Sequence, residues 1–332
     1  MKIFDSFNGG SVEQQKKKKI LILSIIITVA VVAVIAISLT IALIFSSKDS
    51  ETTTDYPDGT IPLVASYKEP EPADIIPGTG TLILVNKENT FDFEANPDST
   101  RVKIADSIPV KKNTTTPLYT LKNSEMTANS AALAQFNKMV EDFYKNNPNA
   151  EKLYINTAYR SKADQDSIGS KIKGGQSDFH TGLSFELKYE NGSEMTEINS
   201  SKNFDWIYQN AHRYGFIVRY PAGHEGEGHA GDETVYKNLT HFFRYVGVAH
   251  ATYIKENNIC LEEYLDRIAA EFSLAADDTA PKAARILKIK GADNASYEVY
   301  YCPKDIAVLV PPRGNYEISA DNKGGYIVTV KK

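Results

Sequence analysis

A run of 26 residues without a charged side chain, Ile20 to Phe45, constrains the fold of this chain more than any other feature. About 20 apolar residues in a helix are enough to cross the hydrocarbon core of a bilayer. The run is too long for the apolar core of a cleaved signal peptide, and Ser46-Ser47-Lys48 after it has no clear cleavage signature. We therefore predict a transmembrane helix over residues 20–45 instead of a buried core helix.

The charges on the two sides of this run predict its orientation. Four lysines, Lys16 to Lys19, precede it, and Asp49 and Glu51 follow it. Because lysine and arginine are retained on the cytoplasmic side, residues 1–19 are expected to form a cytoplasmic tail. The rest is then extracellular, anchored to the cell membrane by a single pass. Residues 46–76 are rich in Thr, Asp, Glu and Pro, which predicts an extracellular linker.

The overall charge argues against a nucleic-acid partner. The chain has a formal net charge of -5 and a pI near 5.8, and the part after the linker has no basic stripe interleaved with aromatic residues. Its 42% hydrophobic and 24% charged residues are ordinary for a globular protein. We therefore expect a folded extracellular part that does not bind nucleic acid.

Residues 77–275 mix helical and strand-like patterns without strict alternation, which predicts an α+β domain. Short apolar runs predict strands at Leu82–Lys87, Leu153–Ala158, Phe216–Tyr220 and Phe242–Val246. Apolar residues at helical spacing predict helices at Ala128–Tyr144, Phe204–Tyr214, Val248–Asn257 and Leu261–Phe272.

Residues 283–332 have a different pattern, which predicts a small all-β module. Such a module is marginally stable alone, so we expect it to pack on the main domain. Its expected strands are Ile286–Ile289, Tyr297–Tyr301, Ile306–Val310, Tyr316–Ser319 and Tyr326–Val330. Cys260 and Cys302, which are the two cysteines of the chain, either form a disulfide between this module and the last helix of the main domain or remain separate thiols.

The stretch Gln176 to Leu187 is the centre of the chemical argument. Glycines lead into alternating residues that end in a carboxylate, which predicts a loop entering a strand. His180 and Glu186 are six residues apart, and an even spacing in a strand places both side chains on one face. Both are therefore expected to line one cleft.

This stretch resembles the Ser-x-His-x-x-Gly-x-x-x-Asp signature of the VanY-type D-alanyl-D-alanine carboxypeptidases, which are zinc peptidases that trim peptidoglycan stem peptides. The resemblance covers roughly residues 80–270 and implies that family's fold. Four blocks in the family's order carry it, and these are Tyr159–Gln165, Ser177–Leu187, Asn210–Pro221 and Arg244–Gly247.

The resemblance also shows which catalytic groups are replaced. In the family, a His, an Asp and a second His hold zinc, and a Glu is the general base. Aligned on Ser177 and Gly182, the first His falls on Phe179 and the Asp falls on Glu186. Counted back from Arg244, the second His falls on Phe242 and the base on Leu239. Phenylalanine cannot ligate zinc and leucine cannot accept a proton, so on this alignment the family's mechanism is lost.

Two alternatives remain open. A bulge or a shift of one residue would let His180, Glu186 and His241 hold zinc as a remodelled site. A two-residue insertion would instead place Lys237 at the base position, where a cation is unsuited to activate water. His224 and His229, in a glycine-rich loop, either recruit a metal or are solvated.

The resemblance implies that Arg160, Gln165 and Ser177 bind the substrate's backbone and terminal carboxylate. The same residues equally fit a hydrogen-bonded scaffold for the cleft.

Three functions follow from these patterns. The first is a membrane-anchored pseudoenzyme that binds a peptidoglycan stem peptide or a cell-envelope protein without cutting it and without a cofactor. The second is an active zinc D,D-carboxypeptidase with remodelled ligands. The third is an extracellular scaffold that docks partners through its C-terminal β module.

Overall fold

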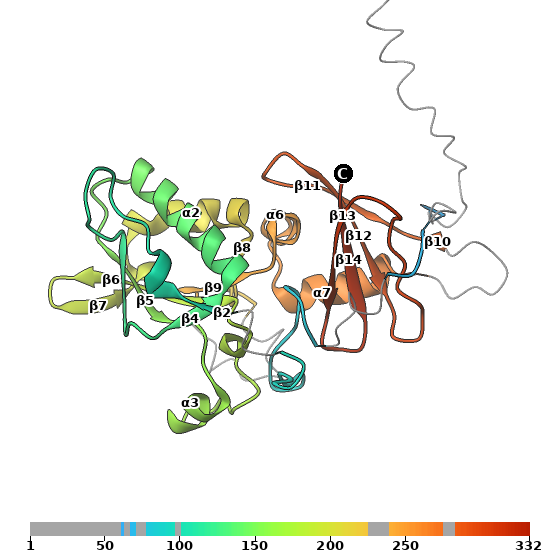
Figure 1. The fold of residues 1–332 in the computed structure, drawn as a ribbon, viewed down its shortest axis with the longest axis horizontal. Coiled ribbons are helices and arrows are strands. Elements are labelled where there is room, and N and C mark those ends of the chain that lie inside the picture. The colour runs from blue at the N-terminus through green and yellow to red at the C-terminus, as the bar shows by residue number, and fades with distance from the viewer. Residues whose placement is uncertain (1–60, 63–66, 71–77, 97–100, 225–238, 275–282) are drawn as a thin grey trace, which may run out of the picture. The chain divides into compact units, whose positions relative to one another are not determined.

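The computed structural model describes residues 61–62, 67–70, 78–96, 101–224, 239–274 and 283–332 (Figure 1). All of them belong to one compact unit, residues 58–332. The predicted cytoplasmic tail and the predicted membrane helix lie outside these residues. Among the described residues, no helix has the length and hydropathy that crossing a membrane requires.

A mixed sheet of six strands organises the first part of the unit. Neighbouring strands within this sheet are antiparallel, except for β3 and β5, which are parallel. In spatial order the strands are β3 (Tyr119–Leu121), β5 (Leu153–Thr157), β6 (Ser184–Asn191), β9 (Phe242–Tyr245) and β8 (Phe216–Val218), with β7 (Glu194–Glu197) paired to β6.

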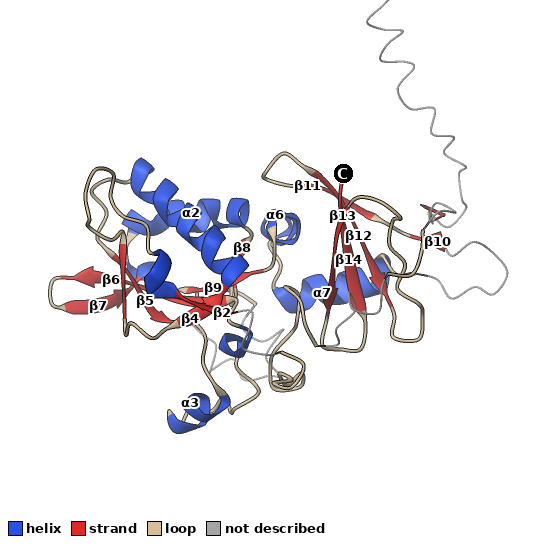
Figure 2. Cartoon of the chain, in the orientation of Figure 1, coloured by secondary structure: helices blue, strands red, loops and turns tan. Residues whose placement is uncertain are grey.

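Helix α2 (Ser130–Asn146) packs on this sheet and supplies much of the first hydrophobic core (Figure 2). Asn129 caps its start by accepting hydrogen bonds from the backbone N–H groups of Ala131 and Ala132. Apolar residues at helical spacing face inward, and the ring of Phe136 stacks on Phe185 of β6 at 4.7 Å between centroids. The helix predicted over Ala128–Tyr144 is confirmed.

Shorter elements surround this core. Strands β2 (Arg101–Lys103) and β4 (Thr127–Asn129) form a separate antiparallel pair. The short helices are η3 (Ile104–Ser107), α3 (Lys162–Ser167), η4 (Asp178–Thr181), η5 (Ile198–Ser200), η6 (Lys202–Phe204), α4 (Asp205–Asn210) and η7 (Ala211–Tyr214).

The continuous helix predicted over Phe204–Tyr214 is instead the series η6, α4 and η7. Phe204, Ile207 and Ala211 still turn one face into the core. Their spacing of three and four residues suits both helix types, so it could not separate a 3₁₀ turn from an α turn.

The C-terminal part contains a four-stranded antiparallel sheet in the order β11 (Leu287–Lys290), β12 (Ser296–Cys302), β14 (Tyr326–Lys331) and β13 (Asn315–Ala320). Helices α6 (Val248–Asn257) and α7 (Leu261–Glu271) share a second hydrophobic cluster with β11, β12 and β14. The module therefore packs on the preceding helices. The domain boundary placed at residue 283 remains a prediction.

Part of the predicted linker is ordered against this C-terminal region. Strand β1 (Ile61–Pro62) pairs with β10 (Ala283–Ala284), and Lys68 forms a bridge with Val310. The strand predicted at Ile306–Val310 is wrong, because only Val310 takes part in strand-like pairing there.

The strand predicted at Leu82–Lys87 is also wrong, although the apolar alternation behind it is real. Leu82 and Leu84 pack into the second cluster, whereas Ile83 and Val85 pack with Phe91 in a separate one. The backbone N–H of Leu82 donates to the side-chain hydroxyl of Ser319 in β13 rather than to a backbone carbonyl of that strand. Alternating burial thus arose from two cores and not from a sheet.

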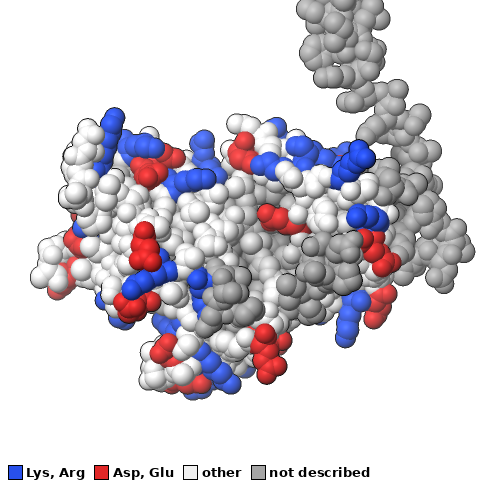
Figure 3. Space-filling model, viewed as in Figure 1, with Lys and Arg blue, Asp and Glu red and all other residues white. Residues whose placement is uncertain are grey.

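Positive and negative side chains are interspersed on the face drawn in Figure 3. A continuous basic stripe, which nucleic-acid binding needs, is not visible on the coloured part of that face. The exclusion of a nucleic-acid partner still rests on the sequence's charge.

Candidate functional site

Three positions of the expected metal site meet where η4 leads into β6 and β6 pairs with β9. Glu186 and Phe242 are direct partners in the β6–β9 register. The Phe179 and Phe242 rings lie 5.1 Å apart between centroids at an interplanar angle of 57°. Phe179 is only 4% exposed. The fold therefore brings Phe179, Glu186 and Phe242 together, as the alignment required, and we call this group the aromatic centre.

Glu186 is the one member of the aromatic centre with a ligand atom, and neighbouring residues already hold its carboxylate. Its Oε2 accepts a 2.6 Å hydrogen bond from the Thr157 hydroxyl and a 2.7 Å bond from the Asn156 amide. Two rings and one tethered carboxylate do not fit zinc, which needs three or four N, O or S donors.

Leu239, which the sequence alignment places at the position of the general base, is partly buried. Its backbone carbonyl accepts a 3.0 Å hydrogen bond from the N–H of Phe242, which fixes the turn into β9. An alkyl side chain has no proton-accepting atom, so this position supplies no general base.

His180 does not face the aromatic centre, and the strand argument that placed it there is wrong. It lies in the 3₁₀ turn η4, which ends at Gly182 with a φ of 68°, before β6 begins at Ser184. Its Nδ1 is 2.6 Å from the carbonyl oxygen of Arg160, and its Nε2 accepts from the backbone N–H of Gly175 at 3.0 Å. Both ring nitrogens are engaged, so His180 has no lone pair directed at a metal.

His241 lies closer to the aromatic centre than His180. Its Nε2 is 3.8 Å from Glu186 Oε1, and its ring packs edge-on against Phe242 at 4.8 Å between centroids. The structure thus brings together two of the three alternative ligands and directs the third elsewhere. Lys237 and His229 lie outside the described residues.

The three residues predicted to bind substrate form part of one hydrogen-bonded chain. The Arg160 guanidinium donates to Thr157 Oγ1 at 3.2 Å and to Gln165 Oε1 at 2.9 Å, and lies 5.0 Å from the Phe179 ring centroid. Gln165 is buried and donates onward to the carbonyl oxygen of Ile172. Ser177 is also buried, and its carbonyl accepts from the His180 N–H. The cationic edge of Arg160 therefore borders the aromatic centre.

A buried ionic network beside the aromatic centre was not predicted. Asp178 Oδ1 accepts from Arg219 Nε at 3.0 Å and from Arg244 Nη1 at 2.6 Å. Arg219 also forms a two-pronged ion pair with Glu262 of α7, at 2.9 and 2.7 Å. Burial alone would raise the pKa of Asp178, but Arg244 and Arg219 lower that pKa to about 2. Asp178, Arg219 and Arg244 all lie in the motif blocks, which is the signal that could have identified them.

The remaining candidates lie near the start of α7 or in the C-terminal sheet. His224, expected to be solvated or to bind metal, places Nδ1 2.9 Å from a carboxylate oxygen of Glu263. Cys260 and Cys302 are both buried thiols that are not joined to each other. Burial raises the pKa of Cys260 to about 12. Of the two alternatives for these cysteines, the structure therefore shows the separate thiols and not the disulfide.

The mixed sheet and its covering helix define the class of this domain, which is α+β. Residues 123–248 match the VanY family model, D-alanyl-D-alanine carboxypeptidase. Over this segment the chain is similar to the VanY-type D-alanyl-D-alanine carboxypeptidases.

Two of the relatives similar to this chain and one of the similar solved structures illustrate the match. A D-alanyl-D-alanine carboxypeptidase of Enterococcus faecium is 30% identical over 223 residues, which are 64% of each chain. The putative carboxypeptidase YodJ of Bacillus subtilis (strain 168) is 36% identical over 120 residues, 36% of this chain and 42% of YodJ. The chain therefore spans less than two thirds of either relative.

The solved structure is that of the vancomycin-resistance D,D-dipeptidase VanXYg in complex with a D-Ala-D-Ala phosphinate analog. It aligns with a TM-score of 0.58 and 22% identity, and the alignment covers 80% of this chain and 98% of that chain. At this identity the likeness establishes the fold.

Proposed function

We propose that this protein is a membrane-anchored, extracellular pseudoenzyme of the cell envelope. Its carboxypeptidase-like domain binds a peptidoglycan stem peptide, or a protein partner, and does not cleave it by the family's zinc mechanism. The relatives named as D-alanyl-D-alanine carboxypeptidases supply the substrate class. The uncharged run over residues 20–45 supplies the anchor, and the lysines before it supply the orientation.

The single observation that carries the loss of catalysis is the contact between the Phe179 and Phe242 rings. The sequence alignment assigns these two positions to the family's zinc-binding histidines. Apolar packing there is favourable in itself, because aromatic pairs contribute about 0.5–1.5 kcal/mol beyond their buried area. The centre is thus stable without a metal, and Leu239 offers no base for a water molecule.

Binding is supported by what surrounds the aromatic centre. The Arg160 guanidinium lies 5.0 Å from the Phe179 ring centroid, and it donates hydrogen bonds to Thr157 and Gln165. Arginine pairs well with carboxylates, and a stem peptide ends in one. A preorganised arginine beside an apolar floor suits a short peptide with small side chains.

The competing function is an active zinc enzyme with ligands His180, Glu186 and His241. The proximity of His241 to Glu186 favours it, and the engagement of both His180 nitrogens opposes it. Restoring His180 as a ligand would require breaking its bonds to Arg160 and Gly175. We therefore favour the pseudoenzyme.

The test is calorimetric binding of a stem pentapeptide ending in D-Ala-D-Ala to the full-length protein. We expect binding without release of D-alanine, weakened about tenfold or more by Arg160→Ala, which removes a charge-assisted hydrogen bond. Arg313→Ala, at an exposed arginine, is the matched control and should bind normally. Peptide that is cut would contradict the proposal, and peptide that does not bind would leave a protein partner as the ligand.

A further inference from the structure

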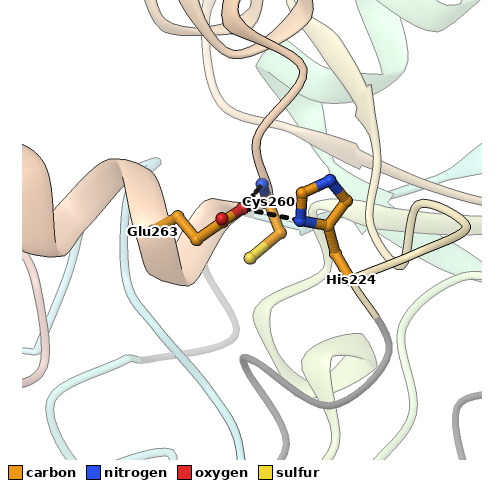
Figure 4. A group of neighbouring side chains, drawn as sticks. All are labelled: His224, Cys260 and Glu263. Carbon is orange, nitrogen blue, oxygen red and sulfur yellow. Dashed lines mark hydrogen bonds and ion pairs between the residues drawn. The ribbon is translucent and has the colours of Figure 1, made fainter.

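Three side chains of metal-binding type converge at the start of α7. His224 follows β8 by six residues, whereas Cys260 and Glu263 are the N-cap and third residue of α7. One ligand atom from each, a nitrogen, a sulfur and an oxygen, lie within 4.8 Å of one another. Figure 4 shows the three side chains turned toward a common point. We call them the His-Cys-Glu cluster.

The protein fold, and not a metal, sets this arrangement. The backbone N–H of Cys260 donates to Glu263 Oε2 at 2.6 Å as one half of a capping box. The segment that carries His224 is fixed to the same helix by the buried Arg219–Glu262 ion pair. His224 itself donates its backbone N–H to the Pro221 carbonyl at 3.2 Å. The three donors are therefore preorganised from both sides.

The donor set and its spacing suit zinc. Imidazole, thiolate and carboxylate bind it at about 2.0–2.3 Å, so ligand atoms around a tetrahedral ion lie roughly 3.3–3.8 Å apart. His224 Nδ1 and Glu263 Oε2 are 2.9 Å apart, and the outer limit of 4.8 Å leaves only small adjustments. A thiolate and an imidazole favour zinc over magnesium or calcium.

Access and charge agree with this assignment. The side chains of His224 and Glu263 are 16% and 26% exposed, so an ion can reach the cluster from solvent, while Cys260 lies underneath. The carboxylate of Glu262, the neighbour of both α7 ligands, is already neutralised by Arg219. A neutral imidazole, one thiolate and one carboxylate would balance the two positive charges of the ion.

We propose that the His-Cys-Glu cluster binds one zinc ion through His224, Cys260 and Glu263, with water as a fourth ligand. On binding, the Cys260 thiol loses its proton to solvent and its sulfur forms the bond to the metal. The ion clamps the segment after β8 to the N-terminus of α7. This site shares no residue with the aromatic centre and does not depend on the proposed function.

Cobalt(II) titration of the metal-free, full-length protein tests the proposal, because a thiolate ligand gives a cobalt charge-transfer band in the near ultraviolet. We expect one equivalent of cobalt to produce the band and zinc to displace it. The aromatic centre contains no thiol and cannot produce this signal. Cys302→Ser, at the other buried thiol, is the matched control and should keep the band.

Three variants assign the ligands. Cys260→Ser should remove the band. His224→Ala should weaken cobalt binding at least about tenfold, since it leaves two protein ligands. Glu263→Gln keeps the capping box and removes the charge, so it should weaken binding while leaving the helix folded.

Circular dichroism checks the fold of each variant. If Cys260→Ser fails to fold, the other two variants decide the assignment. Absence of the band in the folded wild type, or its persistence in Cys260→Ser, would overturn the proposal. Unchanged affinity in both His224→Ala and Glu263→Gln would also overturn it.

Discussion

Two adjacent residues of η4 enter opposite environments. Asp178 enters a buried network of ions with Arg219 and Arg244, whereas Phe179 enters the apolar aromatic centre. A 3₁₀ helix has about three residues per turn, so successive side chains point roughly 120° apart, and His180 takes the third direction. The ionic network pairs two carboxylates with two guanidinium groups. The aromatic centre, in contrast, offers a metal only the carboxylate of Glu186. The buried charges are therefore satisfied without any contribution from the aromatic centre.

The largest expected effect comes from installing the family's zinc ligands and general base at the aromatic centre and at Leu239. The combined substitution Phe179→His, Glu186→Asp, Leu239→Glu and Phe242→His should create a zinc site of about micromolar affinity or better, close to 8 kcal/mol of binding. Isothermal titration with zinc measures it, in a Cys260→Ser background that silences the His-Cys-Glu cluster. A folded variant that binds no zinc would mean that these positions do not correspond to the family's ligands.

Breaking the ionic network should cost more stability than any change at an exposed ion pair. Asp178→Ala leaves Arg219 and Arg244 buried beside each other with one carboxylate fewer, and loss of one partner in a buried pair costs about 3–5 kcal/mol. Urea unfolding measures the free energy. Glu125→Ala, at the exposed Lys103–Glu125 pair, is the control and should leave the midpoint nearly unchanged. Equal losses of unfolding free energy in Asp178→Ala and Glu125→Ala would contradict this prediction.

The same network predicts how stability depends on pH. Asp178 titrates at a pKa of about 2 when folded and near 3.8 when unfolded. Because the folded pKa is depressed, the ionised carboxylate stabilises the folded state at pH values above the unfolded pKa. This stabilisation is lost as the pH falls from about 4 through 2. The loss is about 2 kcal/mol from this group. Unfolding free energies between pH 5 and 2 should therefore fall less steeply in Asp178→Asn than in the wild type. Identical slopes would contradict the assignment.

A smaller effect is expected at Glu186. Glu186→Gln retains the shape of the side chain but loses one charge-assisted acceptor for Thr157 and Asn156, which should cost about 1 kcal/mol. Thermal and urea unfolding measure it. If Glu186 instead held a metal, the substitution would also lower the zinc content of the protein, and that result would favour the remodelled enzyme.

The family fold and the meeting of its metal positions could be predicted from the sequence. Four ordered motif blocks fixed the alignment, and the β6–β9 register then placed Glu186 opposite Phe242 as the alignment required. The direction of His180 could not be predicted, because apolar alternation does not distinguish a 3₁₀ turn from the start of a strand.

Two other features depended on contacts far apart in sequence. The partner of Arg219 on α7, Glu262, lies 43 residues away. That ion pair joins the segment leading to His224 to the helix start that carries Cys260 and Glu263. No local spacing of metal-binding residues signalled the cluster. The capping pattern Cys-x-x-Glu was visible in the sequence but predicts a helix start.

The central claim is that the aromatic centre has replaced the zinc peptidase centre. Its most direct test is D-alanine release from a stem pentapeptide by the full-length protein supplied with excess zinc. The account predicts no release above the background of the peptide alone, in the wild type and in Glu186→Gln alike. Zinc-dependent release by the wild type that Glu186→Gln abolishes would contradict it, and would mean that the chain has rebuilt a working centre around Glu186.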